Sequence, residues 1–325
     1  MIDIVMIWVD GNDPDWQKEL LKYSPNNTGD KRINRFRDWD NLKYWFRGIE
    51  KFAPWVHKIH FVTCGHYPEW LNMNSPKLHF IKHSDYIPEE YLPTFNSHTI
   101  ELNLHRIEGL SEQFIYFNDD IFLLAPIKKE RFFKKKLPCD MGVHTAIMCN
   151  EIGHITYNNI ETINRHFNKK DIIREHFFKY FNFRYGKELL KNICIAPWPQ
   201  ITGFVNPHTA NAFLKSTLNE VWEKENHLLH KTCLHKFRTN EDVSQYLFRF
   251  WQLASGNFCP INTRKDTEQI TINKNNLSEI KRIITSQSKN IICLHDESNT
   301  DFEFCKQEII NYFEEILPNK SSFEI

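Results

Sequence analysis

Residues 3 to 14 read DIVMIWVDGNDP, an apolar run that stops at a turn. A short apolar run closed by a turn signal is typical of a buried β-strand, which we predict from Asp3 to Val9. The turn that follows contains Asp10, Gly11 and Asp13. Aspartates in turns usually hydrogen-bond nearby backbone amides. Two interpretations are therefore open for Asp10 and Asp13: they shape the turn, or they bind a nucleotide or sugar at the strand end.

Strands and helices alternate downstream of this turn. A helix is predicted from residue 39 to 52, because Leu42, Trp45, Phe46 and Ile49 recur at helical spacing. The other elements predicted in this half are strands at 58–63, 77–82, 114–117 and 121–124 and a helix at 96–107. Such alternation indicates an α/β fold with a largely parallel sheet. Ligands of these sheets bind at the carboxyl ends of the strands.

The second half of the chain is predicted to be mostly helical. The candidate helices are residues 159–167, 187–193, 206–222, 241–253 and 301–317, with one strand at 290–293. We therefore divide the chain into an α/β part, residues 1–138, and a helical lobe, residues 139–325, packed together as one compact unit. Residues 24–37 are polar and basic and are predicted to form a mobile loop.

Composition excludes several classes of protein. The 325 residues carry 41 Lys and Arg against 41 Asp and Glu, and this balance argues against a nucleic-acid-binding protein. Eight cysteines occur without any C-x-x-C pair, and no secretory signal or apolar run of 18 residues is present. We expect a reduced, cytoplasmic protein. Peripheral contact with the inner face of the membrane stays open, since residues 128–136 (KKERFFKKK) form a basic run.

The most suggestive group of polar residues is Asn118-Asp119-Asp120, directly after the predicted strand at 114–117. Adjacent carboxylates at a strand end repel each other and attract a cation. Their hard oxygen atoms suit Mg²⁺ or Mn²⁺, ions that commonly bridge protein carboxylates to substrate phosphates. The alternative is a turn with two solvated carboxylates.

Other candidates lie further along the chain. Glu101 lies on the polar side of a predicted helix with two histidines, a zinc-like spacing that also fits a solvated face. His208 is predicted at a helix start, where it is either a base or a packing residue. Arg238 is a candidate phosphate clamp or an ordinary surface cation. Asp296 follows the last predicted strand and is equally ambiguous.

Four blocks of sequence resemble one family. They are residues 3–14, residues 35–55 with 95–120, residues 207–208 with 235–242, and residues 293–296 (CLHD). These blocks resemble the conserved regions of the Stealth family. That family comprises sugar-1-phosphate transferases, among them bacterial capsular polysaccharide phosphotransferases and the catalytic subunit of the lysosomal-enzyme N-acetylglucosamine-1-phosphotransferase. In the fourth block the family has Asn where this chain has His295.

The resemblance implies a GT-A-like (Rossmann-like) sheet that binds a nucleotide-sugar, completed by the helical lobe. It implies transfer of a sugar 1-phosphate from a nucleotide-sugar, such as a UDP-hexose or UDP-N-acetylhexosamine, to a hydroxyl of a polysaccharide or oligosaccharide acceptor. A nucleoside monophosphate leaves, and the product is a phosphodiester-linked capsular polysaccharide. Association with the capsule machinery at the membrane would follow from such a role.

The resemblance also implies roles for individual residues. Its catalytic candidates are His208, Arg238, Asp120 and Glu101. The nucleotide would be held by Asp10, Gly11, Asp13 and Arg37. A divalent cation, Mg²⁺ or Mn²⁺, would be held by Asp119, Asp120 and Asp296. Two alternatives remain: an ordinary glycosyltransferase that releases a nucleoside diphosphate, and a glycan-binding module without catalysis.

Overall fold

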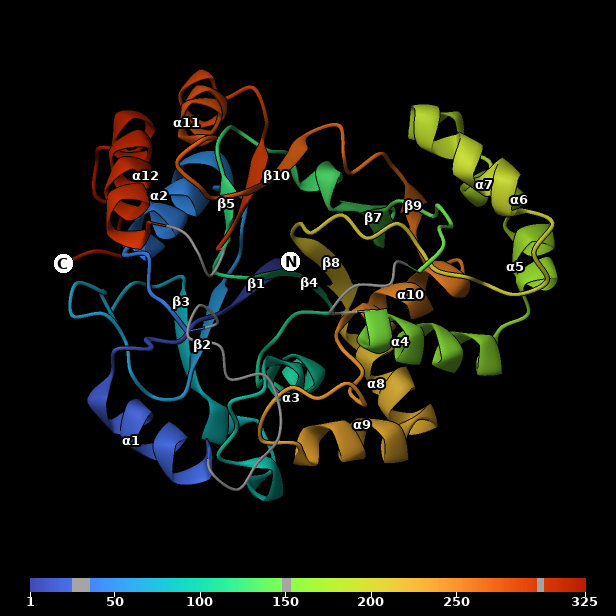
Figure 1. The fold of residues 1–325 in the computed structure, drawn as a ribbon, viewed down its shortest axis with the longest axis horizontal. Coiled ribbons are helices and arrows are strands. Elements are labelled where there is room, and N and C mark those ends of the chain that lie inside the picture. Colours follow the sequence, from blue (N-terminus) through green and yellow to red (C-terminus); the bar gives the residue numbers. More distant parts are fainter. Residues whose placement is uncertain (25–35, 148–152, 297–300) are drawn as a thin grey trace.

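The computed structural model describes residues 1–24, 36–147, 153–296 and 301–325. Most of the loop predicted at residues 24–37 lies outside the described residues, as does Glu297. A twisted sheet runs through the middle of the molecule with helices on both sides, as Figure 1 shows. The predicted α/β class is confirmed.

The central sheet has five strands in the order β3-β2-β1-β4-β8. Its strands are β1 (Ile2–Ile7), β2 (Ile59–Thr63), β3 (Leu78–Lys82), β4 (Gln113–Phe117) and β8 (Asn211–Leu214). The first four are mutually parallel, and β8 pairs antiparallel with β4. Strands β1, β2 and β4 therefore all end at one edge of the sheet, where the turns after them meet.

One face of the sheet is covered by helices from both ends of the chain. Ile4 and Met6 of β1 point to this face and share an apolar core with Trp45 and Phe46. The helices here are α2 (Leu42–Phe52), α11 (Leu277–Ser286) and α12 (Phe302–Ile316), and Figure 1 shows them grouped together. The stripe predicted at residues 39–52 is confirmed, since Trp45 and Phe46 are almost fully buried.

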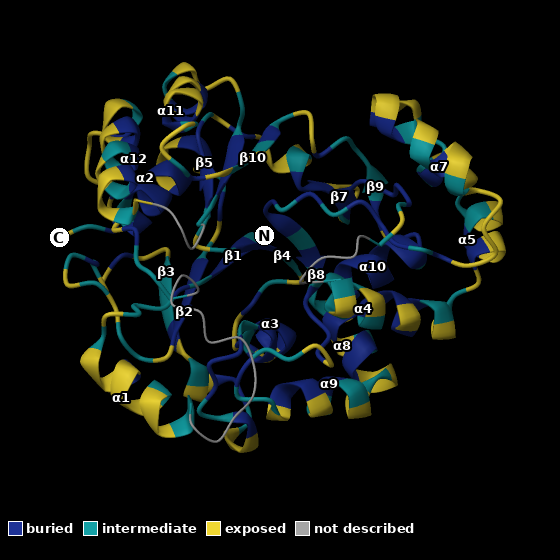
Figure 2. Ribbon diagram, in the orientation of Figure 1, coloured by how far each residue is buried: buried dark blue, intermediate teal, exposed yellow. Residues whose placement is uncertain are grey.

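The opposite face carries most of the other helices. Val5, between Ile4 and Met6, points to this side, as the two-residue period of a strand requires. The covering helices are α3 (Ser97–Leu102), α4 (Gly153–His166), α8 (Lys215–Lys224), α9 (Asn226–Leu234) and α10 (Tyr246–Ala254). Figure 2 shows α4, α8 and α9 with buried inner sides and exposed outer sides, whereas α3 and α10 have no exposed residue.

Two small sheets join segments that are distant in sequence. One has the order β10-β11-β5, with β10 (Thr267–Thr271), β11 (Ile291–His295) and β5 (Ile121–Leu123). The other has the order β6-β7-β9, with β6 (Phe133–Lys134), β7 (Leu137–Asp140) and β9 (Cys259–Pro260). All three sheets thus contain strands from both sides of residue 138, so the two parts proposed from the sequence share their cores.

The remaining elements are short. The other α-helices are α1 (Pro14–Tyr23), α5 (Lys169–Glu175), α6 (Phe177–Tyr180) and α7 (Leu189–Ile195). The 3₁₀ helices are η3 (His83–Asp85), η4 (Glu89–Tyr91), η5 (Leu104–Arg106), η6 (Lys129–Arg131) and η7 (Phe183–Glu188). No helix among the described residues is both long and apolar enough to span a membrane.

The helix predicted at residues 206–222 is wrong over its first half, residues 206–214. Residues 206–210 form a loop, Asn211–Leu214 form β8, and helix α8 begins only at Lys215. A four-residue strand is too short for its alternation to stand out from the helical pattern after it. His208 therefore lies in a loop before a strand and not at a helix start.

Candidate active site

The acidic turn after β4 lies where two other strands converge. The strand after this turn, β5, lies outside the central sheet and pairs antiparallel with β11, with Ile121 opposite Cys293. The amide of Leu294 donates a hydrogen bond of 2.9 Å to the carbonyl of Asp120. On the other side, β8 runs antiparallel to β4, so the loop before Asn211 passes beside the same turn. These two pairings bring His208, Cys293 and Asp120 together.

Four side chains form a compact cluster here. The group consists of Asp120, His208, Cys293 and His295, and one candidate ligand atom from each lies within 4.8 Å of the others. The Cys293 Sγ atom lies 3.1 Å from His208 Nδ1 and 3.3 Å from Asp120 Oδ2. The His295 Nδ1 atom lies 3.5 Å from the same Asp120 oxygen. We call this group the His-Cys cluster.

The His-Cys cluster combines nitrogen, sulfur and oxygen donors. Imidazole and thiol groups suit zinc and similar transition metals, whereas carboxylate oxygens suit Mg²⁺ and Mn²⁺. The second oxygen of Asp120, Oδ1, is buried and has no hydrogen-bond partner among the described residues. An orphaned carboxylate oxygen beside two histidines is consistent with a cation-binding site. The residues therefore fit a divalent ion.

The protonation states in the cluster follow from burial and from Asp120. Burial lowers the pKa of His295, and the neighbouring His208 lowers it further. Burial, together with the charge of Asp120, raises the pKa of the Cys293 thiol well above its usual range. In the absence of a metal, His295 is thus neutral and Cys293 is a thiol. A metal that recruits the sulfur must first displace its proton.

His208 is held between the cluster and Asn118. Its Nε2 atom lies 3.0 Å from the Asn118 side-chain nitrogen, and its Nδ1 atom lies 3.3 Å from His295 Nε2. An amide nitrogen can only donate, so Nε2 is the acceptor and Nδ1 carries the hydrogen. A substrate hydroxyl that replaced the Asn118 amide would meet the basic nitrogen of the ring.

Asp119 differs from Asp120 in its electrostatics. Its side chain reaches solvent but is crowded by surrounding protein, and this burial raises its pKa to about 7. The charge of Asp120 raises the pKa as well, while Arg238 opposes the shift. A carboxyl group with such a pKa is one that a bound cation would readily ionise.

The two aspartates of the turn after β1 stabilise it by accepting hydrogen bonds from nearby backbone amides. Asp10 accepts a hydrogen bond of 2.8 Å from the amide of Asn12, and Asp13 caps helix α1 through a bond of 2.7 Å from Trp16. A Cβ atom added to Gly11 would lie 1.9 Å from the carbonyl oxygen of Phe36. Only glycine permits this contact, which holds the 36–38 segment against the turn.

Two charged residues next to Phe36 face the site from this segment. Arg37 makes an ion pair with Asp296, with Nε and Oδ2 3.0 Å apart. Burial and the charge of Asp40 raise the pKa of Asp38 to about 6, and Asp10 contributes to the shift. Asp296, predicted as a metal ligand, is thus engaged by an arginine. Arg37, predicted as a nucleotide ligand, lies beside the end of β11.

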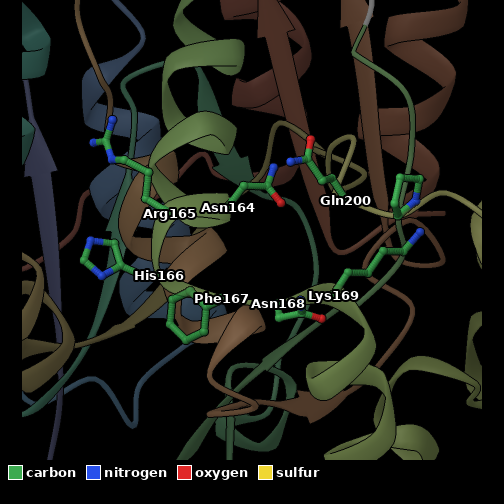
Figure 3. A pocket seen from close by; sticks show the side chains of 8 residues that line it. Asn164, Arg165, His166, Phe167, Asn168, Lys169 and Gln200 are labelled. Atoms are coloured by element: carbon green, nitrogen blue, oxygen red, sulfur yellow. The ribbon is translucent and has the colours of Figure 1, made fainter.

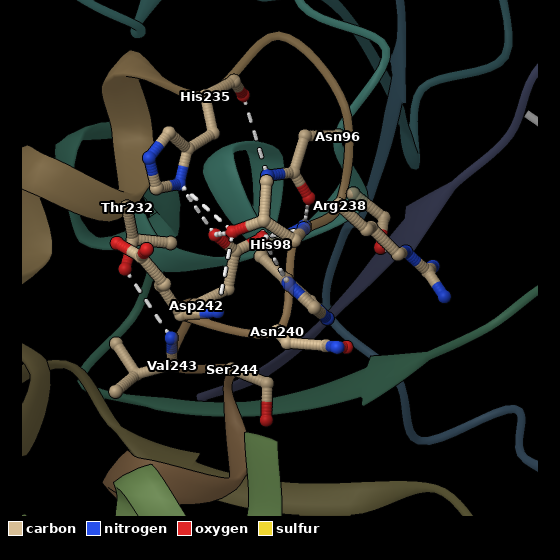
Figure 4. Close-up of polar contacts among 12 residues, drawn as sticks. Asn96, His98, Thr232, His235, Arg238, Asn240, Asp242, Val243 and Ser244 are labelled. Carbon is tan, nitrogen blue, oxygen red and sulfur yellow. Dashed lines mark hydrogen bonds and ion pairs between the residues drawn. The ribbon is translucent and has the colours of Figure 1, made fainter. Parts of the chain in front are cut away.

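Arg238 is delivered by a tightly bonded loop, shown in Figure 4. Asp242 is fully buried and accepts from His98 at 3.1 Å, from His235 at 2.7 Å and from the amide of Thr239 at 3.0 Å. These bonds close the 235–242 loop, and the Arg238 guanidinium donates to Ser97 Oγ at the start of α3. Among the described residues, Ser97 is the one hydrogen-bond acceptor that this guanidinium contacts.

Glu101 lies deeper, behind β4. It accepts a hydrogen bond of 3.0 Å from the hydroxyl of Tyr116. Burial raises the pKa of this hydroxyl well above its usual range, so the hydroxyl keeps its proton. His98 points to Asp242, and His105 packs 5.7 Å from the ring of Trp222. The three side chains of the zinc-like spacing therefore point to three different partners.

The sequence reasoning did not single out several residues of the site. Gln269 donates to His295 at 2.6 Å, and His66 accepts a bond of 2.8 Å from the amide of Asp10. Asp242 and Cys293 were also missed as site residues. Cys293 and His295 are two residues apart on a strand and so share a face, a signal that was available in the sequence.

A separate pocket of about 290 Å³, shown in Figure 3, shares no residue with this site. It is lined by residues 164–169 together with Pro199 and Gln200. Arg165 and His166 at its rim are both paired with Glu225, at 3.0 and 2.6 Å. The third cation of the lining, Lys169, donates to the carbonyls of Ile195 and Trp198, so all three have partners within the protein, and we assign no ligand to this pocket.

The chain is similar to known proteins in sequence and in structure. The model of Stealth protein conserved region 2 matches residues 35–140. A capsular polysaccharide phosphotransferase, WcwK, of Streptococcus pneumoniae is 43% identical over 99% of this chain and 98% of its own. The receptor polysaccharide phosphotransferase WefC of Streptococcus gordonii is 38% identical over 100% and 99%.

A further relative is the exopolysaccharide phosphotransferase cps2G of Lactiplantibacillus plantarum, 38% identical over 99% of this chain and 96% of its own. Among solved structures, the galactosyltransferase LgtC matches with a TM-score of 0.39 at 8% identity, covering 99% of this chain and 98% of that one. The sequence relatives align from end to end and bear phosphotransferase names. The chain therefore belongs to the Stealth family of phosphotransferases.

Proposed function

We propose that this protein transfers a sugar 1-phosphate from a nucleotide-sugar, a UDP-hexose or UDP-N-acetylhexosamine, to a hydroxyl of a growing capsular polysaccharide. The acceptor oxygen attacks the β-phosphorus, the bond from that phosphorus to the bridging oxygen breaks, and a nucleoside monophosphate leaves. The observation that carries this proposal is the position of His208, an imidazole whose acceptor nitrogen meets the Asn118 amide and whose other nitrogen lies 3.7 Å from Asp120. Full-length similarity to named polysaccharide phosphotransferases supports the same reaction class.

Phosphoryl transfer needs positioning and charge neutralisation more than covalent chemistry. His208 takes the proton of the acceptor hydroxyl at Nε2. Its Nδ1 side is backed by the Asp120 carboxylate at 3.7 Å, which stabilises the imidazolium that forms. Arg238 stabilises the negative charge that develops on the phosphoryl oxygens. Asp119 and Asp120, with Asp296 nearby, would hold a divalent Mg²⁺ or Mn²⁺ ion, which would neutralise the diphosphate of the donor.

The turn after β1 grips the nucleotide in this proposal. Asp10, Gly11 and Asp13 present backbone amides and carboxylates at the edge of the sheet, and Arg37 supplies a positive charge beside them. Glu101 acts from behind the strand by holding the Tyr116 hydroxyl, which supports the Asp119 turn. We place the reaction in the cytoplasm, next to the inner face of the membrane where capsule is assembled.

The leaving nucleotide tests the proposal. The protein is incubated with a panel of UDP-sugars, Mg²⁺ and capsule oligosaccharides, and the released nucleotide is identified by mass. We expect UMP together with a phosphodiester-linked product. Release of UDP would instead identify an ordinary glycosyltransferase, and binding without turnover a glycan-binding module. Asp120→Asn protein, purified in parallel, controls for contaminating hydrolases.

A further inference from the structure

A segment remote from the His-Cys cluster exposes an unusual amount of apolar surface. Residues 176–200, which we call the arm, comprise α6, η7, α7 and the chain after them. Six of the 14 large apolar side chains that are exposed in the described part of the chain belong to these 25 residues. They are Phe177, Phe178, Phe183, Leu190, Ile193 and Trp198. An even spread over the chain would put about one there, so the concentration calls for an explanation.

The exposure does not come from a loosely attached segment. The buried side chain of Asn192 donates to the carbonyls of Gly142 and Tyr180, at 2.9 and 2.7 Å. The Lys169 ammonium donates to the carbonyls of Ile195 and Trp198, at 2.6 and 2.9 Å. The arm is thus anchored at its middle and its end. Its inner side is fixed by polar contacts while its outer side presents Phe178 and Phe183, 81% and 91% exposed.

The charges of the arm are almost all positive. Residues 176–200 contain four Lys and Arg and a single acid, Glu188, an excess of three positive charges. Glu188 is buried and paired with Lys191 at 2.7 Å and Arg264 at 3.2 Å. The arm therefore shows solvent no unpaired carboxylate, while Arg184 and Lys187 are exposed between the aromatic residues.

A second basic element lies near the base of the arm. Strand β9 packs against α6 and pairs with β7, the second strand of a hairpin. The turn of that hairpin is Lys135 and Lys136, and Lys134 precedes it at the end of β6; all three are exposed. Figure 1 shows the arm projecting at the edge of the molecule beyond β9. Aromatic rings and cations are thus presented on one projecting part of the structure.

We propose that the arm docks the protein on an anionic lipid surface. Phenylalanine and tryptophan side chains insert at the boundary between head groups and acyl chains, and lysine and arginine attract anionic lipid. The projecting shape suits a flat surface better than a peptide, which would need a groove. A second copy of the chain would bring identical positive charges together, which disfavours self-association through the arm. The proposal does not depend on the reaction catalysed.

Vesicle binding by the full chain tests this, without donor or acceptor. The protein is sedimented with vesicles of equal parts phosphatidylglycerol and phosphatidylcholine, and with vesicles of phosphatidylcholine alone. We expect binding to the anionic vesicles only, weakened by salt. Phe178→Ser with Phe183→Ser should lower the partition coefficient on the order of tenfold or more, as should Arg184→Glu with Lys187→Glu. Thermal unfolding of each variant checks that the fold is intact.

The matched control is Leu21→Ser with Phe304→Ser, two apolar side chains 69% and 50% exposed outside the arm. These changes should leave vesicle binding unaltered. The proposal is overturned if the wild-type protein ignores anionic vesicles, or if the control pair loses as much binding as the arm pair. It is also overturned if the protein is a dimer by light scattering and the Phe178 and Phe183 changes make it a monomer. All arm variants should keep wild-type turnover on a short soluble acceptor.

Discussion

The imidazole rings of His208 and His295, 87 residues apart in the chain, stack with their centroids 4.7 Å apart and their planes within 3°. His295 stands at the end of β11, and His208 stands in the loop before β8. Burial keeps His295 neutral, so the pair can share a site without repulsion between two imidazolium ions. This stacking orients the His208 ring so that its Nε2 atom faces Asn118.

His208→Ala should reduce turnover by about 10²–10⁴-fold, the usual loss when a general base is removed. Donor affinity should change little, because the proposed role of Nε2 is to take the proton of the acceptor hydroxyl and not to hold the donor. Single-turnover kinetics measures the effect on turnover, and a titration of UDP-sugar binding measures the effect on donor affinity. Weakened donor binding with unchanged turnover would contradict the base role, and normal values for both would leave His208 as a packing residue. Asn118→Ala controls for the loss of the hydrogen bond alone.

A chelator should abolish activity, and Mg²⁺ or Mn²⁺ should restore it. Asp120→Asn should lose on the order of 10²-fold or more in turnover at saturating metal, as expected when one fixed charge-stabilising group is removed. The Asp120 oxygen without a partner motivates this prediction. Full turnover of the wild-type protein in excess chelator would eliminate the cation from the reaction.

Arg238→Lys should not rescue Arg238→Ala. A planar guanidinium can grip two phosphoryl oxygens at once, whereas an ammonium is a point charge. Ser97→Ala, which removes the hydroxyl that Arg238 contacts, should have a smaller effect than either change. The measurement is kcat/KM for the donor. Recovery of most of the rate by lysine would reduce Arg238 to a source of general positive potential.

Asp119 should make stability depend on pH. Its pKa rises from 3.8 to about 7 on folding, so the folded protein holds a proton that the unfolded chain releases over this range. The contribution of this proton to the free energy of unfolding is thus fully present below the ordinary Asp pKa of 3.8, and it falls as the pH rises toward 7. Asp119→Asn should therefore melt a few degrees above wild type at pH 8 in chelator, with little difference at pH 4. Glu69→Gln, at an exposed surface carboxylate, should show no such trend.

Zinc should inhibit the enzyme by binding to the His-Cys cluster. The donors of His208, Cys293 and His295 suit zinc better than magnesium, and zinc bound there would occupy the proposed base. His295→Asn, which removes one imidazole donor of the cluster, should raise the inhibitory zinc concentration about tenfold or more while Mg²⁺-dependent turnover persists. Equal zinc sensitivity of Cys293→Ser, His295→Asn and wild type would place the inhibitory ion elsewhere.

Local sequence was sufficient for the class of fold and for placing the acidic turns of the candidate site at strand ends. The apolar runs before Asp10 and Asn118 predict strands because a buried strand needs little more than a short apolar segment and a turn after it. Parallel strands end at one edge, so the two acidic turns lie at the same edge of the sheet. The helix at residues 42–52 was equally visible, since its apolar stripe repeats over three turns.

Only the tertiary structure showed which other side chains reach these turns. His208 reaches the acidic turn because β8 pairs antiparallel with β4, and Cys293 and His295 reach it because β11 pairs with β5. Pairing between strands so distant in sequence depends on register and on packing of the whole core, which no local pattern encodes. The sequence therefore offers candidate residues one at a time, and the folded sheets decide which of them meet.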